Sequence, residues 1–238
     1  MKLTVIGEYG PFAPAGGACS CYLLQGRDGG AVVLDLGNGS LAELQKHIAL
    51  CEIEAIVLTH LHFDHISDLQ ILGYALGQMQ ARGEYQKKIR LFLPKTPEAI
   101  SQLYALPLFE VRYLEEDLEA QVAGMRLVFA RMSHPVEAYA VVAEEEGKCL
   151  LYSGDTTRNA AVERLAEMAD FVLLDAGLLE AQAGENAPHM SVREACEVGR
   201  FAGQMVLTHH YPYNTKDQIR REALEEAVLA QSGMTFEI

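Results

Sequence analysis

The sequence lacks the long apolar runs of membrane proteins and the basic clusters of nucleic-acid-binding proteins. No stretch of about 18 uninterrupted apolar residues occurs in the 238 residues, so no membrane span is predicted. Lys and Arg number 19 against 33 Asp and Glu, and the formal net charge is −14. An exterior of this sign repels nucleic acid and anionic membranes. We therefore expect no membrane partner and no general affinity for nucleic acid.

Cysteine is also too scarce and too scattered for a disulfide framework. The five cysteines are Cys19, Cys21, Cys51, Cys149 and Cys196. The Cys19-Ser20-Cys21 pair has no second pair elsewhere, which favours buried or loop thiols over a soft metal site. The segment 1–7 has one basic residue and a short apolar stretch, so it predicts a first strand and not a signal peptide. Both features favour the cytoplasm.

The composition and the order of apolar segments predict one α/β domain. Half of the residues are apolar and 22% are charged, which suits a globular core. No linker interrupts residues 1–238, so we expect a single domain. Short apolar strands alternate with helical stretches throughout. The predicted strands are 3–7, 21–25, 31–36, 55–58, 89–93, 125–131, 138–144, 148–152, 171–174, 205–207 and 234–238.

Several predicted helices begin at a recognisable cap. In a capping box, a Ser side chain accepts from a free backbone N–H and a Glu or Gln three residues later reaches back. The three such pairs are Ser40 with Glu43, Ser67 with Gln70, and Ser191 with Glu194. Thr96-Pro97 marks a fourth start, with the proline in the first turn, and we expect the last helix over residues 216–230.

Two apolar strands each deliver a histidine at the carboxyl end. The segment 56–60, ending in Thr59-His60, is similar to the segment 205–209, ending in Thr208-His209. This echo indicates two similar halves whose polar strand ends meet at one edge, although chance similarity of two β/α turns would also produce it.

The densest polar motif follows the first of these strands. His60, His62, Asp64 and His65 lie within six residues. In an extended segment, residues two apart point the same way, so His60 and His62 can bind one ion together. The chain can then turn and present Asp64 and His65 to a second ion.

Further ligands are expected at the ends of other strands on the same edge. His134, Asp155 and His209 each follow a predicted strand. We assign His60, His62 and His134 to one ion, Asp64, His65 and His209 to another, and Asp155 to both. Nitrogen-rich ligation with carboxylates suits two zinc ions, and manganese or iron would also accept it. His210 is the alternative to His209 if the register is shifted by one.

With these residues in place, the sequence resembles the metallo-β-lactamase fold hydrolases. The run His-x-His-x-Asp-His, a distant His, Gly-Asp-Thr and a final Thr-His extend the resemblance over essentially the whole chain. It implies a four-layer αββα sandwich with a dinuclear metal site at one edge of the two sheets. Authentic β-lactamases generally lack a bridging aspartate at Asp155 and are secreted, so antibiotic hydrolysis is disfavoured.

The order of motifs after Asp155 resembles the tRNase Z and phosphodiesterase branch. In that branch an acidic residue and a histidine ahead of the last ligand assist cleavage. By this resemblance, Asp175 would orient His189, and His189 would protonate the leaving oxygen or contact phosphate. The branch usually has Glu where Asp175 stands, so a structural strand-end carboxylate is the alternative for Asp175 and a surface loop histidine is the alternative for His189.

The likeness to true tRNase Z is incomplete in one respect. Only 20 residues separate His134 from Asp155, which leaves no room for a tRNA-binding arm. We therefore expect a small-molecule substrate, most simply a phosphodiester, and not tRNA. In the hypothesised mechanism a hydroxide bridges the two ions, Asp64 orients it, and His189 assists the leaving alcohol.

Other activities remain open on the same fold. A lactonase or a glyoxalase II-like thioesterase would share the seven ligands. An iron-dependent redox enzyme is a further alternative, although oxygen reductases generally carry Glu where His62 stands. A non-catalytic protein is disfavoured because every expected ligand is present.

Residues around the predicted ligands have simpler interpretations. Asp35 would brace the ligand loop or serve only in a turn. The loop 10–17 would line the mouth of the site or be an ordinary turn. Tyr211 and Tyr213 either contact substrate or pack at the rim. The sequence sets no oligomeric state and leaves a homodimer open.

Overall fold

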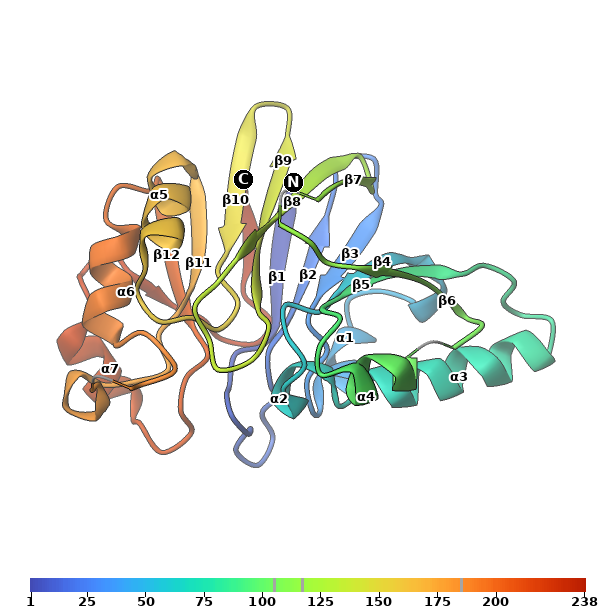
Figure 1. The fold of residues 1–238 in the computed structure, drawn as a ribbon, viewed down its shortest axis with the longest axis horizontal. Coiled ribbons are helices and arrows are strands. Elements are labelled where there is room, and N and C mark those ends of the chain that lie inside the picture. Colours follow the sequence, from blue (N-terminus) through green and yellow to red (C-terminus); the bar gives the residue numbers. More distant parts are fainter. Residues whose placement is uncertain (105, 117, 185) are drawn as a thin grey trace.

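The computed structural model describes residues 1–104, 106–116, 118–184 and 186–238, and its centre is a pair of seven-stranded sheets. The two sheets pack against each other in the middle of the molecule, and both chain termini lie at the same edge of them (Figure 1). In spatial order, the first sheet contains β14 (Thr235–Glu237), β1 (Lys2–Gly7), β2 (Cys21–Gln25), β3 (Ala31–Leu34), β4 (Ile53–Val57), β5 (Ile89–Leu93) and β6 (Phe109–Tyr113).

The second sheet repeats this arrangement with later segments of the chain. Its spatial order is β13 (Val228–Leu229), β12 (Gln204–Thr208), β11 (Phe171–Asp175), β10 (Lys148–Tyr152), β9 (Tyr139–Glu145), β8 (Met125–Arg131) and β7 (Glu119–Val122). In each sheet four neighbouring strands are parallel, β3–β4–β5–β6 or β10–β11–β12–β13, and the first of the four pairs with an antiparallel neighbour, β2 or β9. The two halves are therefore similar, but β4 has the position of β11 and not of β12, so the echo in the sequence does not join equivalent strands.

Helices cover the outer face of each sheet. On the first sheet they are α1 (Ser40–Leu44), α2 (Phe63–Ile66), α3 (Leu69–Ala81) and α4 (Glu98–Ser101). On the second sheet they are α5 (Ala160–Met168), α6 (Val192–Gly199) and α7 (Lys216–Glu222). Short 3-10 turns lie at Leu50–Glu52, Gln102–Tyr104 and Glu180–Gln182. Within the described residues, no helix has the length and apolar character needed to cross a membrane.

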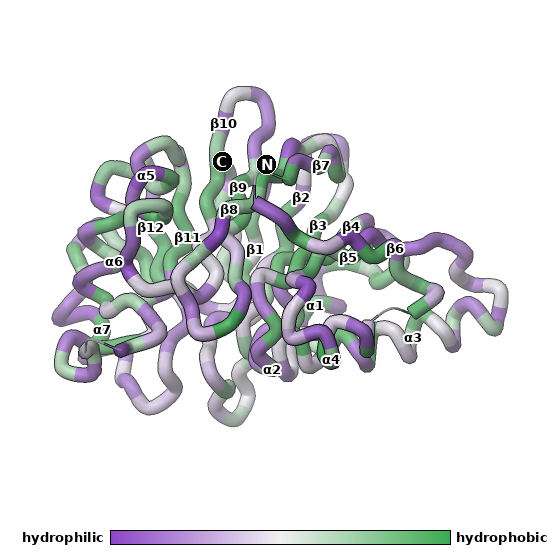
Figure 2. The backbone as a smooth tube through the Cα atoms, viewed as in Figure 1, coloured by the Kyte–Doolittle hydropathy of each residue, from purple (hydrophilic) through white to green (hydrophobic). Residues whose placement is uncertain are grey.

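Three apolar clusters hold these four layers together. The central cluster takes side chains from both sheets, including Tyr22 and Phe92 from the first and Phe129 and Leu173 from the second. The two others lie between each sheet and its own helices. The strands carry the most hydrophobic stretches of the chain, and the connecting loops are mostly hydrophilic (Figure 2). The predicted αββα sandwich is confirmed.

All eleven predicted strands are present, and the end of the last helix was placed wrongly. Helix α7 stops at Glu222, not at Ala230, and the chain then forms β13, which pairs in parallel with β12. The Ala230 N–H donates to the Leu207 carbonyl over 2.8 Å. Pairing with the open edge of β12 satisfies backbone groups and buries Ala227, which outweighs the helical propensity of this Ala- and Glu-rich segment.

Of the three predicted capping boxes, only the one at Ser191 forms. The Ser191 hydroxyl accepts from the Glu194 N–H over 3.1 Å, and the Glu194 carboxylate accepts from the Ser191 N–H over 2.9 Å. Ser40 lies inside the first turn of α1, and its hydroxyl donates to the Gly37 carbonyl over 2.6 Å. The Ser67 hydroxyl donates back to a carbonyl of α2, so it is not available to cap α3.

Tertiary structure supplies the missing cap. The carboxylate of Asp68, at the start of α3, accepts from the Leu41 N–H in the first turn of α1 over 2.8 Å. Pro97 precedes α4 as its N-cap residue, whereas the sequence suggested that it lies in the first turn.

The central cluster generates a stability prediction. Leu173 is fully buried between the sheets, so Leu173→Ala removes about 2–5 kcal/mol from the free energy of unfolding. The matched control is Leu224→Ala, because Leu224 is 40% exposed and its truncation changes the same quantity by less than about 0.5 kcal/mol. Urea denaturation at fixed metal content measures both, and equal destabilisation of the two variants would contradict this account of the core.

Candidate metal centre

The loop after β4 carries the first four predicted ligands, and hydrogen bonds to Asp35 fix its conformation. The Thr59 N–H donates to Asp35 Oδ1 over 2.7 Å, which ends the strand and starts an extended segment. His62 is extended, with φ −72° and ψ 148°, so His60 and His62 face the same way. Helix α2 then begins at Phe63 and turns Asp64 and His65 toward a second point. The local backbone therefore divides the motif between two clusters.

Three imidazoles and one carboxylate make up the first cluster. Nδ1 of His62 lies 3.0 Å from Nε2 of His60 and 3.1 Å from Nε2 of His134. Asp155 Oδ2 lies 3.5 Å from His60 Nε2. His134 comes from the loop after β8 and Asp155 from the loop after β10, so strand ends of both sheets contribute.

The second cluster shares Asp155 with the first. His65 Nε2 lies 3.3 Å from Asp155 Oδ1 and 3.6 Å from Asp64 Oδ2. His209 Nε2, which follows β12, lies 3.2 Å from Asp64 Oδ2 and 3.3 Å from Asp155 Oδ2. In each cluster the four ligand atoms lie within 4.8 Å of one another. Asp155 is the one residue of these two groups that belongs to both.

Hydrogen bonds on the far side of the rings fix which nitrogen faces the centre. His65 Nδ1 donates to Asp35 Oδ2 over 2.8 Å, and His134 Nδ1 donates to the Pro188 carbonyl over 3.0 Å. The Thr59 hydroxyl donates to Asp35, so it can accept from His60 Nδ1, 3.2 Å away. In all three rings the proton on Nδ1 leaves Nε2 as the inward atom.

These residues fit two metal ions. Tetrahedral zinc with Zn–N bonds of about 2.0–2.1 Å would place its ligand nitrogens about 3.3 Å apart, close to the 3.0 and 3.1 Å of the first cluster. His65 Nε2 is buried and has no hydrogen-bond partner among the described residues. Burial also holds the pKa of His60 well below its usual value, so this imidazole is neutral and has a free lone pair.

The pKa values of His65 and Asp155 are set by their neighbours more than by burial. Burial lowers the pKa of His65, but the carboxylates of Asp155, Asp35 and Asp64 outweigh it, and the pKa lies well above its usual value. An ion at the second cluster would therefore displace a proton from His65. Burial raises the pKa of Asp155, but its neighbours His209 and His65 overcome this effect, and the pKa of Asp155 lies well below its usual value.

Asp35 forms the strongest support behind the ligands. Its carboxylate also accepts from the Tyr152 hydroxyl over 2.7 Å, so it joins the first sheet to β10 of the second. Its backbone has φ +56°, a left-handed conformation that is uncommon for a residue with a side chain. The interpretation of Asp35 as a bracing residue agrees with these contacts.

His209 is held in a similarly unusual conformation, with φ +60°. Gly10 lies against its imidazole so closely that a Cβ at Gly10 would overlap Nε2, Cε1 and Cδ2 of the ring. The Gly10 N–H donates to the His210 carbonyl over 3.3 Å. The loop 10–17 is therefore part of the wall of this centre, and a glycine is required where it passes His209.

Asp175 and His189 lie together beside the second cluster. His189 Nδ1 donates to Asp175 Oδ2 over 2.9 Å, and Asp175 also accepts from the N–H groups of Thr156 and Gly177, both over 3.0 Å. The His189 ring stacks on His209, with centroids 4.7 Å apart. Burial lowers the pKa of His189, but Asp175 more than compensates and raises it to about 9.

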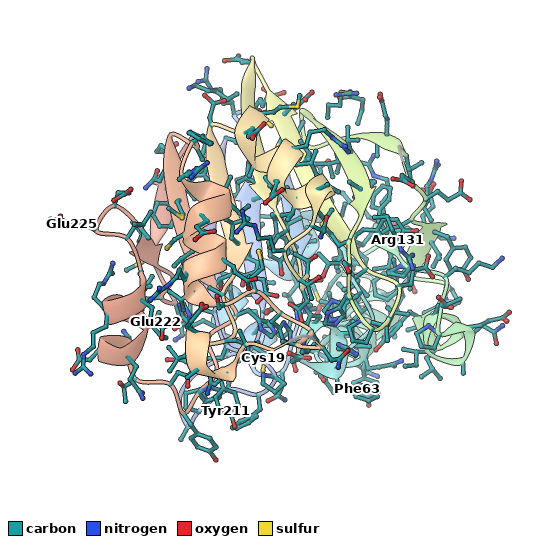
Figure 3. All side chains as sticks on the ribbon, turned by 60° about the vertical axis from the view of Figure 1, so that its left-hand side comes forward. Cys19, Phe63, Arg131, Tyr211, Glu222 and Glu225 are labelled. Carbon is teal, nitrogen blue, oxygen red and sulfur yellow. The ribbon has the colours of Figure 1, made fainter. Side chains whose placement is uncertain are left out.

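All nine residues selected from the sequence thus meet at one edge of the two sheets, opposite the chain termini (Figure 1). The roles of the seven as metal ligands, and of Asp64, Asp175 and His189 in catalysis, stay predictions. Sequence reasoning did not identify the Tyr152 hydroxyl or the Pro188 carbonyl, because neither residue type is a metal ligand. The buried Cys19 and Cys21 are free thiols, and Cys19 lies near this edge (Figure 3).

Comparisons with known proteins agree with this geometry. A sequence model of the metallo-beta-lactamase superfamily matches residues 14–222. The chain is 29% identical to the "Probable metallo-hydrolase YhfI" of Bacillus subtilis, and the alignment covers 100% of both proteins. The crystal structure of YhfI, described as a metallo-beta-lactamase fold protein, superposes with a TM-score of 0.92 at 26% identity and covers 99% of this chain and 98% of that one.

Two more distant structures share the fold. The short form of human tRNase Z has a TM-score of 0.77 at 19% identity, with 100% of this chain and 99% of that chain covered. A diphosphatase of the PhnP family has a TM-score of 0.76 at 19% identity, with 100% and 97% covered.

The contacts of Asp35 generate a prediction about metal affinity. Asp35→Asn keeps the shape of the side chain but removes the charge that fixes His65, so metal affinity falls about 10- to 100-fold. Competition with a chromogenic chelator measures it. Asp170→Asn is the matched control, because Asp170 pairs with Lys148 at the surface and should leave affinity unchanged. A folded Asp35→Asn protein with wild-type affinity would contradict the bracing role.

Proposed function

The chain belongs to the metallo-β-lactamase superfamily, and from this premise we propose that it is a dinuclear metal-dependent hydrolase of small phosphodiesters. The observation that carries the proposal is the Asp175–His189 pair, which lies directly beside the shared ligand Asp155. His189 Nδ1 is 2.9 Å from Asp175 Oδ2 and 3.7 Å from Asp155 Oδ2. A proton donor whose ring lies beside the residue that would hold both ions suits cleavage of an ester with a poor leaving group.

The orientation of His189 supports its assignment as the general acid. Because Nδ1 donates to Asp175, Nε2 is the nitrogen left to exchange a proton with substrate. His189 also lines a cavity of about 460 Å³, together with Thr157, Arg158 and Glu180. We assign this cavity to the leaving alcohol, since the departing oxygen must come within hydrogen-bond reach of His189.

Two divalent ions, most simply zinc, would supply Lewis acidity and bring the ionisation of water near pH 7. The protein itself contributes alignment. Asp64 Oδ2 lies 3.2 Å from His209 Nε2. In this position the Asp64 carboxylate can orient the attacking nucleophile. Imidazole and carboxylate ligands of this composition favour zinc over magnesium or calcium.

Substrate size follows from the segment between His134 and Asp155. Strands β9 and β10 are joined directly by Glu146 and Gly147, both with positive φ, which is a tight hairpin turn. No extended arm occurs in this described segment. The formal charge of −14 also opposes a long polyanion. The short human tRNase Z and the PhnP-family diphosphatase, whose names denote phosphate-bond chemistry, share the fold and support a phosphoester substrate.

Turnover of bis-p-nitrophenyl phosphate tests the proposal. We expect the metal-loaded protein to hydrolyse it, and His60→Ala and Asp155→Ala to lose at least about 100-fold in kcat/KM, because each removes a ligand of the first cluster or of both. The matched control is His47→Ala, since His47 is an exposed histidine outside the clusters. Full activity in both ligand variants would overturn the proposal.

The same preparation separates the rival hydrolases. A lactone, a thioester and a phosphodiester are compared at equal metal content, and metal analysis follows purification without added zinc. We expect two zinc ions per chain and the highest kcat/KM for the phosphodiester. A clear preference for the lactone or thioester would replace the phosphodiesterase proposal, and bound iron with oxygen consumption would favour a redox enzyme.

The role of His189 predicts a dependence on the leaving group. His189→Ala lowers kcat about 100- to 10,000-fold for a dialkyl phosphodiester, whose alkoxide must be protonated as it leaves. The loss is much smaller for p-nitrophenyl esters, because nitrophenolate leaves without a proton. Steady-state kinetics over a series of leaving groups measures how kcat depends on the pKa of the leaving alcohol. Equal losses for good and poor leaving groups would exclude His189 as the general acid.

A further inference from the structure

Three aromatic side chains, Phe12, Tyr211 and Tyr213, form a partly exposed group that we call the aromatic shelf. The ring centroid of Phe12 lies 6.1 Å from that of Tyr211 and 5.5 Å from that of Tyr213, and the centroids of the two tyrosine rings are 5.6 Å apart. All three pairs are edge-to-face, with interplanar angles of 82°, 68° and 88°. The rings therefore hold one another in place.

Solvent reaches two of the three rings freely, while Tyr211 is half-buried. Phe12 is 41% exposed and Tyr213 is 74% exposed. Edge-to-face contact uses the edge of one ring and the face of another, so an exposed ring of the group keeps a face open to solvent. Exposed apolar surface that is gathered beside a polar site is a common mark of ligand binding.

The shelf is continuous with the candidate metal centre. Phe12 follows Gly10, which lies against the His209 ring, and Tyr211 follows His209 by two residues. An isolated β-bridge pairs Tyr9 with His210, so the loop 9–17 and the loop after β12 run together. Figure 3 shows Tyr211 at the same edge of the molecule as Phe63 and Cys19. Phe12 and Tyr211 thus lie on the two loops that meet at His209.

The loop that carries Phe12 and the proposed acid approach His209 differently. His189 stacks on the His209 ring with an interplanar angle of 24°, whereas Gly10 contacts the Nε2, Cε1 and Cδ2 edge. The cavity at His189 is lined by polar residues such as Arg158, Glu180 and Glu194. None of the shelf residues lines that cavity. The two substituents of a phosphodiester would therefore meet different surfaces.

We propose that Phe12, Tyr211 and Tyr213 form a substrate subsite that stacks a planar ring carried by the non-leaving substituent of the phosphodiester. This inference rests on the proposed function and names the substrate class more narrowly. A flat aromatic or heteroaromatic ring matches exposed ring faces, while an alkyl chain gains little from them. The tyrosine hydroxyls add hydrogen-bonding groups at the rim of the shelf. The ring belongs either to a nucleobase or to a simple aryl ester.

Three substrates with one leaving group test the subsite. Thymidine 5′-p-nitrophenyl phosphate, phenyl p-nitrophenyl phosphate and ethyl p-nitrophenyl phosphate all release nitrophenolate and differ only in the retained group. We expect kcat/KM for at least one ring-bearing ester to exceed that of the ethyl ester by about 5- to 150-fold, the range of one stacking contact. The faster of the two ring-bearing esters identifies the source of the ring.

Substitutions on the shelf separate stacking from structure. Tyr213→Leu and Phe12→Leu should remove most of the preference, measured as the ratio of kcat/KM for the ring-bearing ester to kcat/KM for the ethyl ester, while Tyr213→Phe retains the ring and the preference. Tyr74→Leu is the matched control, because Tyr74 on α3 is 72% exposed, almost the same as Tyr213. A preference below twofold in the wild type, or one that survives both shelf substitutions, overturns the inference.

A binding experiment distinguishes failure of the subsite from failure of the proposed function. Calorimetry on the metal-loaded protein compares thymidine 5′-monophosphate and phenyl phosphate with ribose 5-phosphate, which has no planar ring. We expect a ring-bearing ligand to bind more tightly, and Tyr213→Leu to abolish the difference. If no diester is hydrolysed but this pattern holds, the subsite stands and the phosphodiesterase proposal fails. Equal affinity for all three ligands overturns the subsite, whatever the turnover.

Discussion

The carboxylate of Asp35 is the contact on which the arrangement of the candidate site depends. It accepts from the Thr59 N–H and hydroxyl, from His65 Nδ1 and from the Tyr152 hydroxyl. One buried anion therefore ends strand β4, sets the orientation of a ligand and ties the first sheet to the second. Removing a charge so placed would leave several buried donors unpaired, which is costly in a region without solvent.

The site is built under strain that neighbouring contacts maintain. Asp35 and His209 both have positive φ, at +56° and +60°. Such conformations persist only where surrounding structure determines them. For Asp35 the hydrogen bonds just described do this, and for His209 the close approach of Gly10 and the bridge between Tyr9 and His210 do it. The inward direction of the ligand atoms follows from this backbone and not from the ligands alone.

The protein carries a strongly negative net charge, yet its candidate metal centre has the ligands to bind cations. The two clusters bring three aspartates, Asp64, Asp155 and the nearby Asp175, to one buried edge with five imidazoles of the ligand set. Burying carboxylates so close together is costly unless positive charge offsets it. Two divalent cations would provide that charge locally and would also attract an anionic substrate that the overall charge of −14 otherwise repels.

Spacing along the chain was enough to identify the α/β class, the eleven most apolar strands and the seven candidate ligands, because strand ends and the His-x-His-x-Asp-His run are local features. Asp175 and His189 were identified by the resemblance to the tRNase Z and phosphodiesterase branch. The local pattern failed to predict elements whose structure depends on contacts with residues far away in the sequence. Strands β6 and β7 were not predicted, since they are edge strands rich in exposed charged residues, as at Glu110, Arg112 and Glu119. Asp68 caps α1 from 27 residues away, and α7 ends early because β12 offers an open edge.

The sequence by itself determined which side chains could bind metal and at which strand ends they stand. Only the tertiary structure decided which nitrogen of each histidine faces inward, and that Asp35 accepts from the Tyr152 hydroxyl of the other sheet. The second contact joins residues 117 positions apart in the sequence. Such contacts form only when the two sheets pack face to face. The spacing of residues along the chain does not specify the distance between two surfaces that meet on packing.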